Sequence, residues 1–277
     1  MIAQPFEQIL ESLRANDLVV HDCHAHIGPA FNFANIAPAA DDLIRTMDVA
    51  GFRTAYVSAL LGMADEDLGD AALEDAAARY PDRIRPVPIA NPNHGRATLD
   101  YLERCRTDSR IRMLKVHPTL HEYPASGPAY GPIFEMAGHS GWPVLSHTWS
   151  GGPDPGEFAE LARRHPHTTF ILGHSGGVLP GIRAAVDVAR SADNVYLDLA
   201  CSIPYDCVLE WMVDQLGDER ILFGTDATFF DPRPQFGRVV MARISSESKR
   251  RILGANLSRI VSRLGPVRID ASGIDVA

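Results

Sequence analysis

The chain repeats one pattern over most of its length: a short apolar run, a turn, and a segment with apolar residues three and four positions apart. Short apolar runs are typical of buried strands, and the second spacing is typical of amphipathic helices. The pattern predicts strands at residues 18–26, 54–60, 84–90, 112–117, 143–147, 169–174, 194–200 and 220–226. It predicts helices at 41–50, 71–80, 95–106, 133–140, 157–164, 179–189, 207–216, 237–244 and 247–264.

Strands that alternate with helices form parallel sheets, because each helix carries the chain back to the start of the next strand. Eight such units in about 250 residues match a (β/α)8 TIM barrel. We therefore expect an α/β fold with a single domain over residues 1–277. A helix at 5–15 and the C-terminal helices at 237–264 are expected to pack outside the barrel. An open doubly wound sheet is the alternative, although no GxGxxG follows the first strand.

The composition is that of an ordinary soluble protein, with 45% hydrophobic and 22% charged residues among 277. A net charge of −9 argues against nucleic acid or an anionic membrane as a partner. No apolar run reaches the ~18–20 residues of a membrane helix, and the N-terminus lacks a signal-peptide pattern. We expect a cytoplasmic protein with a small-molecule substrate, and a homodimer is left open. The cysteines, at positions 23, 105, 201 and 207, form no CxxC pair and are expected to be reduced.

The first predicted strand ends in two histidines, His24 and His26, with one residue between them. Residues two apart on a strand share a face, so both imidazoles can bind one divalent cation at Zn–N distances of ~2.0–2.1 Å. Cys23 and Ala25 are then expected to point the other way, into packing. The alternative is a pair of ordinary histidines at a polar strand end.

Further chemically active side chains stand at the ends of four other predicted strands. In a (β/α)8 barrel the carboxyl ends of all strands meet at one face, where the catalytic residues lie. We therefore expect one site that contains His24, His26 and a set from strands four, five, six and eight: Lys115, His117, His147, His174 and Asp226.

Five short motifs occur in an order that resembles a known family. They are residues 22–26 (DCHAH), 115–118 (KVHP), 143–147 (PVLSH), 173–177 (GHSGG) and 224–226 (GTD). The chain is similar to the amidohydrolase superfamily, above all to its amidohydrolase-related branch with the aminocarboxymuconate semialdehyde decarboxylase group. Residues 252–256 (ILGAN) also resemble that branch.

The resemblance implies that one divalent cation is held by His24, His26, His147 and Asp226. Zinc is the first expectation and manganese the alternative, since imidazole and carboxylate ligands suit both. It also implies that Asp226 moves a proton between a metal-activated water and the substrate. His147 could instead be a hydrogen-bonded core histidine.

His174 is implied to polarise the substrate or relay a proton, with a role as a second metal ligand as the alternative. Lys115 is ambiguous, because in two-metal branches a lysine at this place is carbamylated and bridges both ions. We favour one metal, with Lys115 or its neighbour His117 available to a substrate carboxylate. Phe31, Trp149 and Arg233 follow strand ends and are candidate substrate contacts, whereas Asp198 is expected to be structural.

Three functions remain open at this point. The first is hydrolysis of a C–O or C–N bond in a small carbonyl compound by metal-activated water. The second is non-oxidative decarboxylation of an unsaturated or aromatic carboxylic acid, and the third is non-catalytic metal binding. A strongly cationic mouth that binds carboxylates would favour decarboxylation, but beyond Lys115 and Arg233 few basic residues lie near the predicted strand ends, which favours hydrolysis.

Overall fold

Eight parallel strands form the centre of the computed structural model, which describes residues 6–29, 39–152 and 154–262. The strands are β1 (His21–Ile27), β2 (Thr54–Ala59), β3 (Ile84–Pro86), β4 (Leu114–Val116), β5 (Val144–His147), β6 (Phe170–Gly173), β7 (Val195–Asp198) and β8 (Ile221–Leu222). They pair in the orders β1-β2-β3 and β4-β5-β6-β7-β8. Every predicted apolar run overlaps one of these strands, and most strands are shorter than the run.

Backbone hydrogen bonds join the two sheets at both of their edges. Between β3 and β4, the amide of Lys115 donates to the carbonyl of Pro88 at 2.8 Å. Between β8 and β1, the amide of Asp226 donates to the carbonyl of His24, also at 2.8 Å. The eight strands thus close on themselves, and the predicted (β/α)8 barrel is confirmed.

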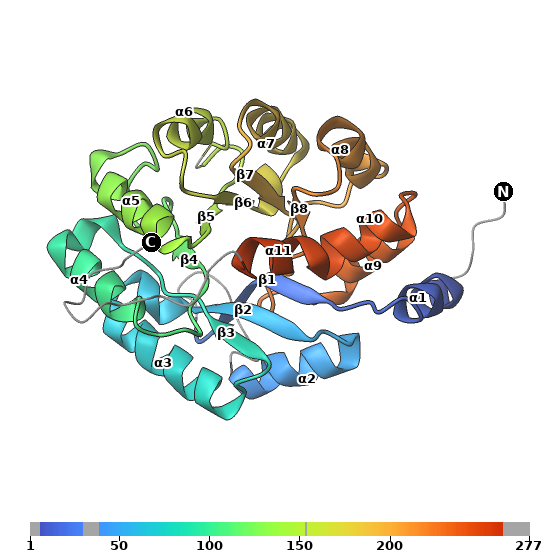
Figure 1. Cartoon of the computed structure of the whole chain (residues 1–277), viewed down its shortest axis with the longest axis horizontal. Coiled ribbons are helices and arrows are strands. Elements are labelled where there is room, and N and C mark those ends of the chain that lie inside the picture. Colours follow the sequence, from blue (N-terminus) through green and yellow to red (C-terminus); the bar gives the residue numbers. More distant parts are fainter. Residues whose placement is uncertain (1–5, 30–38, 153, 263–277) are drawn as a thin grey trace.

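Helices surround the strands on the outside (Figure 1). They are α1 (Phe6–Arg14), α2 (Ala40–Ala50), α3 (Glu66–Arg79), α4 (Arg96–Cys105), α5 (Gly131–Ser140), α6 (Glu157–Arg164), α7 (Leu179–Ser191), α8 (Val208–Leu216), α9 (Arg233–Met241), α10 (Ser246–Arg250) and α11 (Asn256–Ser262). α3 begins five residues before its predicted start because Asp65 caps it and accepts a hydrogen bond from the amide of Leu68 at 3.0 Å. None of the described helices combines the length and apolarity needed to cross a membrane.

The inside of the barrel is filled by one side chain from or beside each strand. These are Cys23, Tyr56, Val87, Met113, Leu145, Ile171, Tyr196 and Leu222. Leu257 and Ile260 of α11 pack against this cluster, and Figure 1 shows α11 lying across the strands near β1 and β8. A larger apolar layer lies between the strands and the surrounding helices. Since one end of the barrel is filled in this way, a substrate site is confined to the other end.

An irregularity in β1 changes where its side chains point. The pairing of β1 with β2 shifts register between Asp22 and Ala25, as at a β-bulge, which inserts one extra residue into a strand. Ala25 packs in the outer layer, as expected, but Cys23 lies in the cluster inside the barrel. The expectation that Cys23 and Ala25 share a face is therefore wrong, because the alternation of side chains is interrupted between them.

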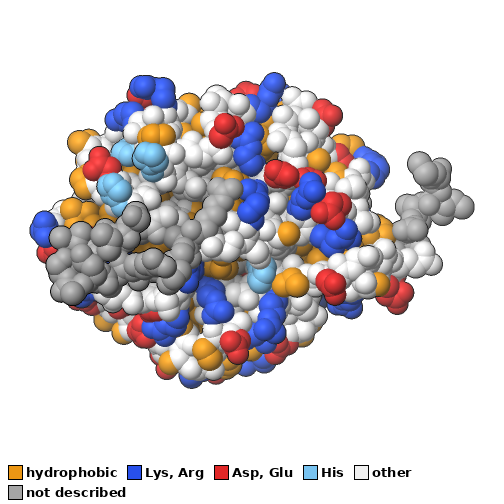
Figure 2. All heavy atoms as spheres, viewed as in Figure 1, with side chains coloured by type: hydrophobic (Ala, Val, Ile, Leu, Met, Phe, Trp, Pro, Cys, Tyr) orange, Lys and Arg blue, Asp and Glu red, His pale blue; other side chains and the backbone are white. Residues whose placement is uncertain are grey.

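Charges of both signs are mixed over the face of the molecule that Figure 2 shows. Lys and Arg side chains lie among Asp and Glu side chains, without a broad patch of one sign outside the grey region.

Candidate active site

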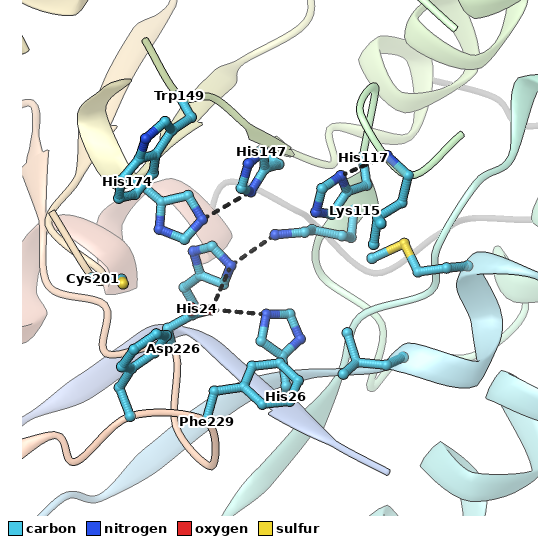
Figure 3. A pocket seen from close by; sticks show the side chains of 14 residues that line it. His24, His26, Lys115, His117, His147, Trp149, His174, Cys201, Asp226 and Phe229 are labelled. Carbon is cyan, nitrogen blue, oxygen red and sulfur yellow. Dashed lines mark hydrogen bonds and ion pairs between the residues drawn. The ribbon is translucent and has the colours of Figure 1, made fainter. Parts of the chain in front are cut away.

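A pocket of about 370 Å³ lies at the carboxyl ends of the strands. It is lined by His24, His26, Leu60, Met63, Lys115, His117, Leu120, His147, Trp149, His174, Cys201, Asp226, Phe229 and Phe230 (Figure 3). The structure thus brings together every predicted site residue except two. Phe31 lies outside the described residues, and Arg233 is not among the lining side chains.

His24 is held at the base of the pocket by a buried carboxylate. Its Nδ1 lies 2.5 Å from Oδ2 of Asp198 on β7, and neither side chain is exposed to solvent by more than 1%. Its Nε2 lies 2.7 Å from Nζ of Lys115 and 3.5 Å from Oδ1 of Asp226. Gly224 makes room for this arrangement, since a Cβ at that position would collide with the carboxylate of Asp198.

His26 is positioned in the same way by a neighbouring strand. Its Nδ1 lies 2.9 Å from the hydroxyl of Ser58 on β2, and its Nε2 lies 3.0 Å from Oδ1 of Asp226. In both histidines Nδ1 is therefore occupied by a protein partner, whereas Nε2 faces Asp226. Such pairing of the second nitrogen is usual for histidines that bind metals, because it fixes the ring and its tautomer.

The donor set fits a divalent cation by its spacing as well as by its chemistry. Two ligands of one tetrahedral zinc at ~2.0–2.2 Å are about 3.3–3.6 Å apart. The distances of 3.5 and 3.0 Å from Oδ1 of Asp226 to the Nε2 atoms of His24 and His26 are close to that range. The ligand atoms of His24, His174 and Asp226 also lie within 4.8 Å of one another.

His174 and His147 form a second pair beside this group. Nδ1 of His174 lies 2.8 Å from the carbonyl of Ala200, so this nitrogen carries the proton that it donates. Nε2 of His174 lies 3.0 Å from Nδ1 of His147, whose ring stacks on that of His117 at a centroid distance of 4.1 Å. His147 thus contacts the group through His174, on the side of β5 and β6.

Burial dominates the electrostatics of the site. It lowers the pKa of His24 well below its usual value and lowers the pKa of Lys115 to about 8. Burial alone would raise the pKa of Asp226, but the hydrogen bond with His26 and the nearby His174 and His24 hold it far below its usual range. Asp226 is therefore ionised and available as an anionic ligand.

Asp22 and Ser58 belong to the supporting network but were not predicted from the sequence. Asp22 accepts hydrogen bonds from the amide of His24 at 3.0 Å and from the amide of Thr225 at 3.1 Å, and it also accepts one from the Thr225 hydroxyl. Asp22 thus joins β1, which carries His24, to the segment after β8, which carries Asp226. Burial raises the pKa of Asp22 to about 7. The available signal was its place inside an apolar strand, two residues before His24.

The walls of the pocket are apolar and come from the loops that follow the strands. Leu60 and Met63 follow β2, Leu120 follows β4, and Phe229 follows β8. Trp149, after β5, lies beside His174 with a centroid distance of 5.7 Å. Its indole occupies the space above Gly177, where a Cβ would collide with the ring and where φ is +74°. The predicted place of Trp149 at the mouth is thus explained by a glycine 28 residues away.

Arg233 lies in a neighbouring groove instead of the pocket. Its side chain is 74% exposed, and its Nε lies 2.9 and 2.8 Å from the two carboxylate oxygens of Asp231. The partners are two positions apart in the sequence, so a local ion pair directs the guanidinium away from the site. The structure therefore does not bring this candidate substrate contact to the other site residues.

Comparisons with known proteins agree with this geometry. The amidohydrolase family model matches residues 58–261. The fold is similar to 2,6-dihydroxybenzoate decarboxylase from Rhizobium (TM-score 0.72, 17% identity, 90% of this chain and 99% of that chain). It is also similar to 5-carboxyvanillate decarboxylase from Novosphingobium aromaticivorans with manganese and 4-hydroxy-3-methoxy-5-nitrobenzoic acid (0.69, 11%, 89% and 96%).

A third similar structure is a probable 2-pyrone-4,6-dicarboxylic acid hydrolase from Acinetobacter baumannii with citric acid bound (TM-score 0.63, 14% identity, 88% of this chain and 99% of that chain). No curated protein sequence matches the chain. The family match covers well over half of the sequence and includes His147, His174 and Asp226. This chain therefore belongs to the amidohydrolase family of enzymes.

Proposed function

We propose that the chain is a metal-dependent decarboxylase of a small aromatic or unsaturated carboxylic acid. The observation that carries this proposal is the division of the pocket into two parts. Its base holds the histidines, Lys115 and Asp226, whereas the side chains around it are apolar or aromatic. A carboxylate fits the base, and the carbon skeleton that bears it fits the walls.

The cation would be held by His24, His26 and Asp226, with His147 as the fourth ligand that the family resemblance implies. The Nε2 atoms that face Asp226 and the occupied Nδ1 atoms support this set. We propose one divalent ion, zinc or manganese. When bound, it would supply a Lewis acid that fixes and polarises an oxygen of the substrate.

Lys115 is placed to orient the substrate carboxylate. Its side chain is 1% exposed and its ammonium group lies at the base of the pocket, 2.7 Å from Nε2 of His24. An ammonium ion acts as a compact point charge toward such an anion. The walls then hold the ring so that the carboxylate stays at the base.

The reaction breaks the bond between the ring carbon and the carboxyl carbon and releases carbon dioxide. The electron pair stays on the ring carbon, which must take up one proton. Water supplies this proton, and Asp226 and His174 are proposed to relay it, because both line the pocket at its polar base. Nδ1 of His174 is held by the carbonyl of Ala200, so Nε2, which lies 3.0 Å from Nδ1 of His147, is the atom through which the ring can relay a proton.

The apolar walls favour this chemistry over simple binding. A charged carboxylate is stabilised less in apolar surroundings than in water, whereas carbon dioxide is neutral and leaves readily. The carboxylate itself lies at the base, so after the bond has broken only the apolar ring remains, against the apolar walls.

Hydrolysis of a C–O or C–N bond is the second candidate. The observation that favours it is the ionised Asp226, which lies 3.0 Å from Nε2 of His26 and could accept a proton from water. His174 would then polarise the carbonyl group or protonate the leaving group. The scarcity of basic side chains in the described pocket lining is compatible with hydrolysis as well as with decarboxylation.

The test is a panel of small acids, lactones and amides, supplied to protein loaded with zinc or manganese. We expect carbon dioxide release from at least one hydroxybenzoate-like acid, and its absence from a His24→Ala/His26→Ala variant. Ester, lactone or amide cleavage without carbon dioxide would select hydrolysis. Full turnover by the double variant would contradict both candidates.

We also propose a cytoplasmic location. It is supported by the four cysteines, which are all free thiols in the structure. Two of them, Cys23 and Cys105, are buried, as expected for packing residues in a reducing compartment.

A further inference from the structure

The distribution of positive charge in the pocket limits the number of anionic groups that a ligand can carry. Among the described residues that line the pocket, Lys115 is the one lysine, and no arginine is present. Its ammonium group lies at the base, against His24. The pocket's basic side chain and its proposed cation are therefore at the same end.

The apolar part of the pocket, as far as the structure describes it, offers no counter-charge to a second anion. It consists of Leu60, Met63, Leu120, Trp149, Phe229 and Phe230. The nearby guanidinium of Arg233 is already paired with Asp231 and lies in the adjacent groove. The sequence between the end of β1 and the start of α2 contains no Lys or Arg either.

Aromatic side chains on two sides of the pocket limit the shape of the ligand. Trp149 lies beside His174, and Phe229 lies beside His26 with a centroid distance of 5.3 Å. Figure 3 shows these two rings on opposite sides of the group formed by His24 and Lys115. A volume of about 370 Å³ is at the lower end for ligand pockets and suits one small ring.

From these observations we infer that the ligand is a single-ring monocarboxylate, and that the pocket rejects the same ring with a second carboxylate on its far side. This inference rests on the proposed function and narrows its substrate class. A second carboxylate would have to leave water and lie against apolar walls without a partner, which is costly. We expect at least about 100-fold weaker binding of such a dicarboxylate.

The test uses two probes that differ by one group. Salicylate carries one carboxylate, and 2-hydroxyterephthalate is the same molecule with a second carboxylate para to the first, across the ring. Their dissociation constants are measured by calorimetry with the manganese-loaded protein, so no turnover is needed. Salicylate should bind, and the dicarboxylate should bind at least about 100-fold more weakly.

A positive charge placed in the wall should reduce the discrimination against the dicarboxylate. Leu120 is partly exposed and follows β4, so Leu120→Arg would put a guanidinium at the far end. We expect this variant to bind the dicarboxylate at least about 10-fold more tightly than the matched Leu120→Gln variant does. Affinity for salicylate should be similar in both. Phe230→Arg, at a 41% exposed position, is the second variant if Leu120→Arg does not fold.

The outcomes separate this inference from the proposed function. Equal affinity of the wild-type protein for both probes would overturn the inference alone, as would an unchanged preference in both arginine variants. If the loaded protein binds neither probe, the carboxylate site is absent and both proposals fail. If the preference is found but neither carbon dioxide release nor hydrolysis follows for any compound, the proposed function fails and the charge limit stands.

Discussion

Nδ1 of His24 lies 2.5 Å from Oδ2 of Asp198, although 174 positions separate the two residues in the sequence. Burial raises the pKa of this carboxylate to about 6, so the contact with the imidazole is made by a group whose charge is costly to keep. The contact orients His24 so that its Nε2 faces Asp226. Asp198, expected to be structural, is thus a positioning residue for the proposed metal site.

We expect Asp198→Asn to lower metal affinity by about 10–100-fold, the usual effect of removing the carboxylate partner of a metal-binding histidine. Competition with a chelator at neutral pH measures this. The control is Asp187→Asn, at an exposed position of α7, which should leave the affinity unchanged. An equal affinity in both variants would show that Asp198 does not act through His24.

Metal content is the second prediction. Purified protein should contain about one divalent ion per chain, because the Nε2 atoms of His24 and His26 converge on Asp226. Elemental analysis should show loss of this metal in a His24→Ala/His26→Ala variant. Two ions per chain, together with the extra mass of a carbamate on Lys115, would identify a two-metal site instead.

Asp226 and His174 should be separable by their effects on metal and on turnover. Asp226→Asn should remove nearly all activity while part of the metal remains, since an amide oxygen can coordinate weakly but cannot carry the proton. His174→Ala should keep near-full metal occupancy and lose turnover by roughly 10²–10⁴-fold. If His174→Ala loses metal as completely as the His24 and His26 variants, His174 is a ligand.

His121 should make stability depend on pH. It is 3% exposed, its Nδ1 lies 2.9 Å from the hydroxyl of Tyr130, and burial lowers its pKa to about 4. Because the folded state resists protonation, the unfolded state binds more protons between the unfolded pKa, ~6.5, and the folded value. Stability should therefore be complete above that window and decrease as the pH falls through it, by roughly 3 kcal/mol in total.

Urea unfolding at pH 7, 6, 5 and 4 measures this decrease. His121→Gln removes the titrating group and should flatten the curve relative to the wild-type protein. His139→Gln, at an exposed position of α5, is the matched control and should follow the wild-type curve. Parallel curves for all three proteins would show that His121 makes no contribution.

The position of Trp149 should depend on Gly177. An alanine there would place its Cβ in the indole ring and would also adopt a φ of +74°, which is unfavourable for residues with a Cβ. We expect Gly177→Ala to shift tryptophan fluorescence and to destabilise the protein by about 2–4 kcal/mol. Gly217→Ala separates the two causes, because φ is +79° there and a Cβ would have open space. It should cost only about 1 kcal/mol and leave the fluorescence unchanged.

The strand ends were predictable because hydrophobic periodicity is local. An apolar run followed by His147 or by His174 specifies both a buried strand and the place where its polar end emerges. In a parallel barrel those ends meet regardless of the loops between them. The convergence of the histidines and Asp226 therefore required only the period of the pattern and the chirality of βα units.

Features that depend on contacts between distant segments were not predictable in the same way. The bulge in β1 results from its pairing with β2 on one side and β8 on the other, so no local signal reveals that Cys23 points inward. The pocket walls come from loops without periodicity. Arg233 was predicted wrongly for a different reason. Its position after a strand end suggested a substrate contact, but its ion pair with the nearby Asp231 directs the side chain away from the pocket.

The edge where β8 meets β1 has a consequence for how the protein is made. Asp22 and Thr225 bond across this edge although they are 203 positions apart. A nascent chain that has not reached Asp226 already contains every histidine of the pocket, but it lacks the carboxylate and the strand that completes the ring. The complete donor set of the proposed metal site can therefore form only after Asp226 has been synthesised. A bound cation would then fasten together the first and last strands, whose encounter carries the largest loss of chain entropy.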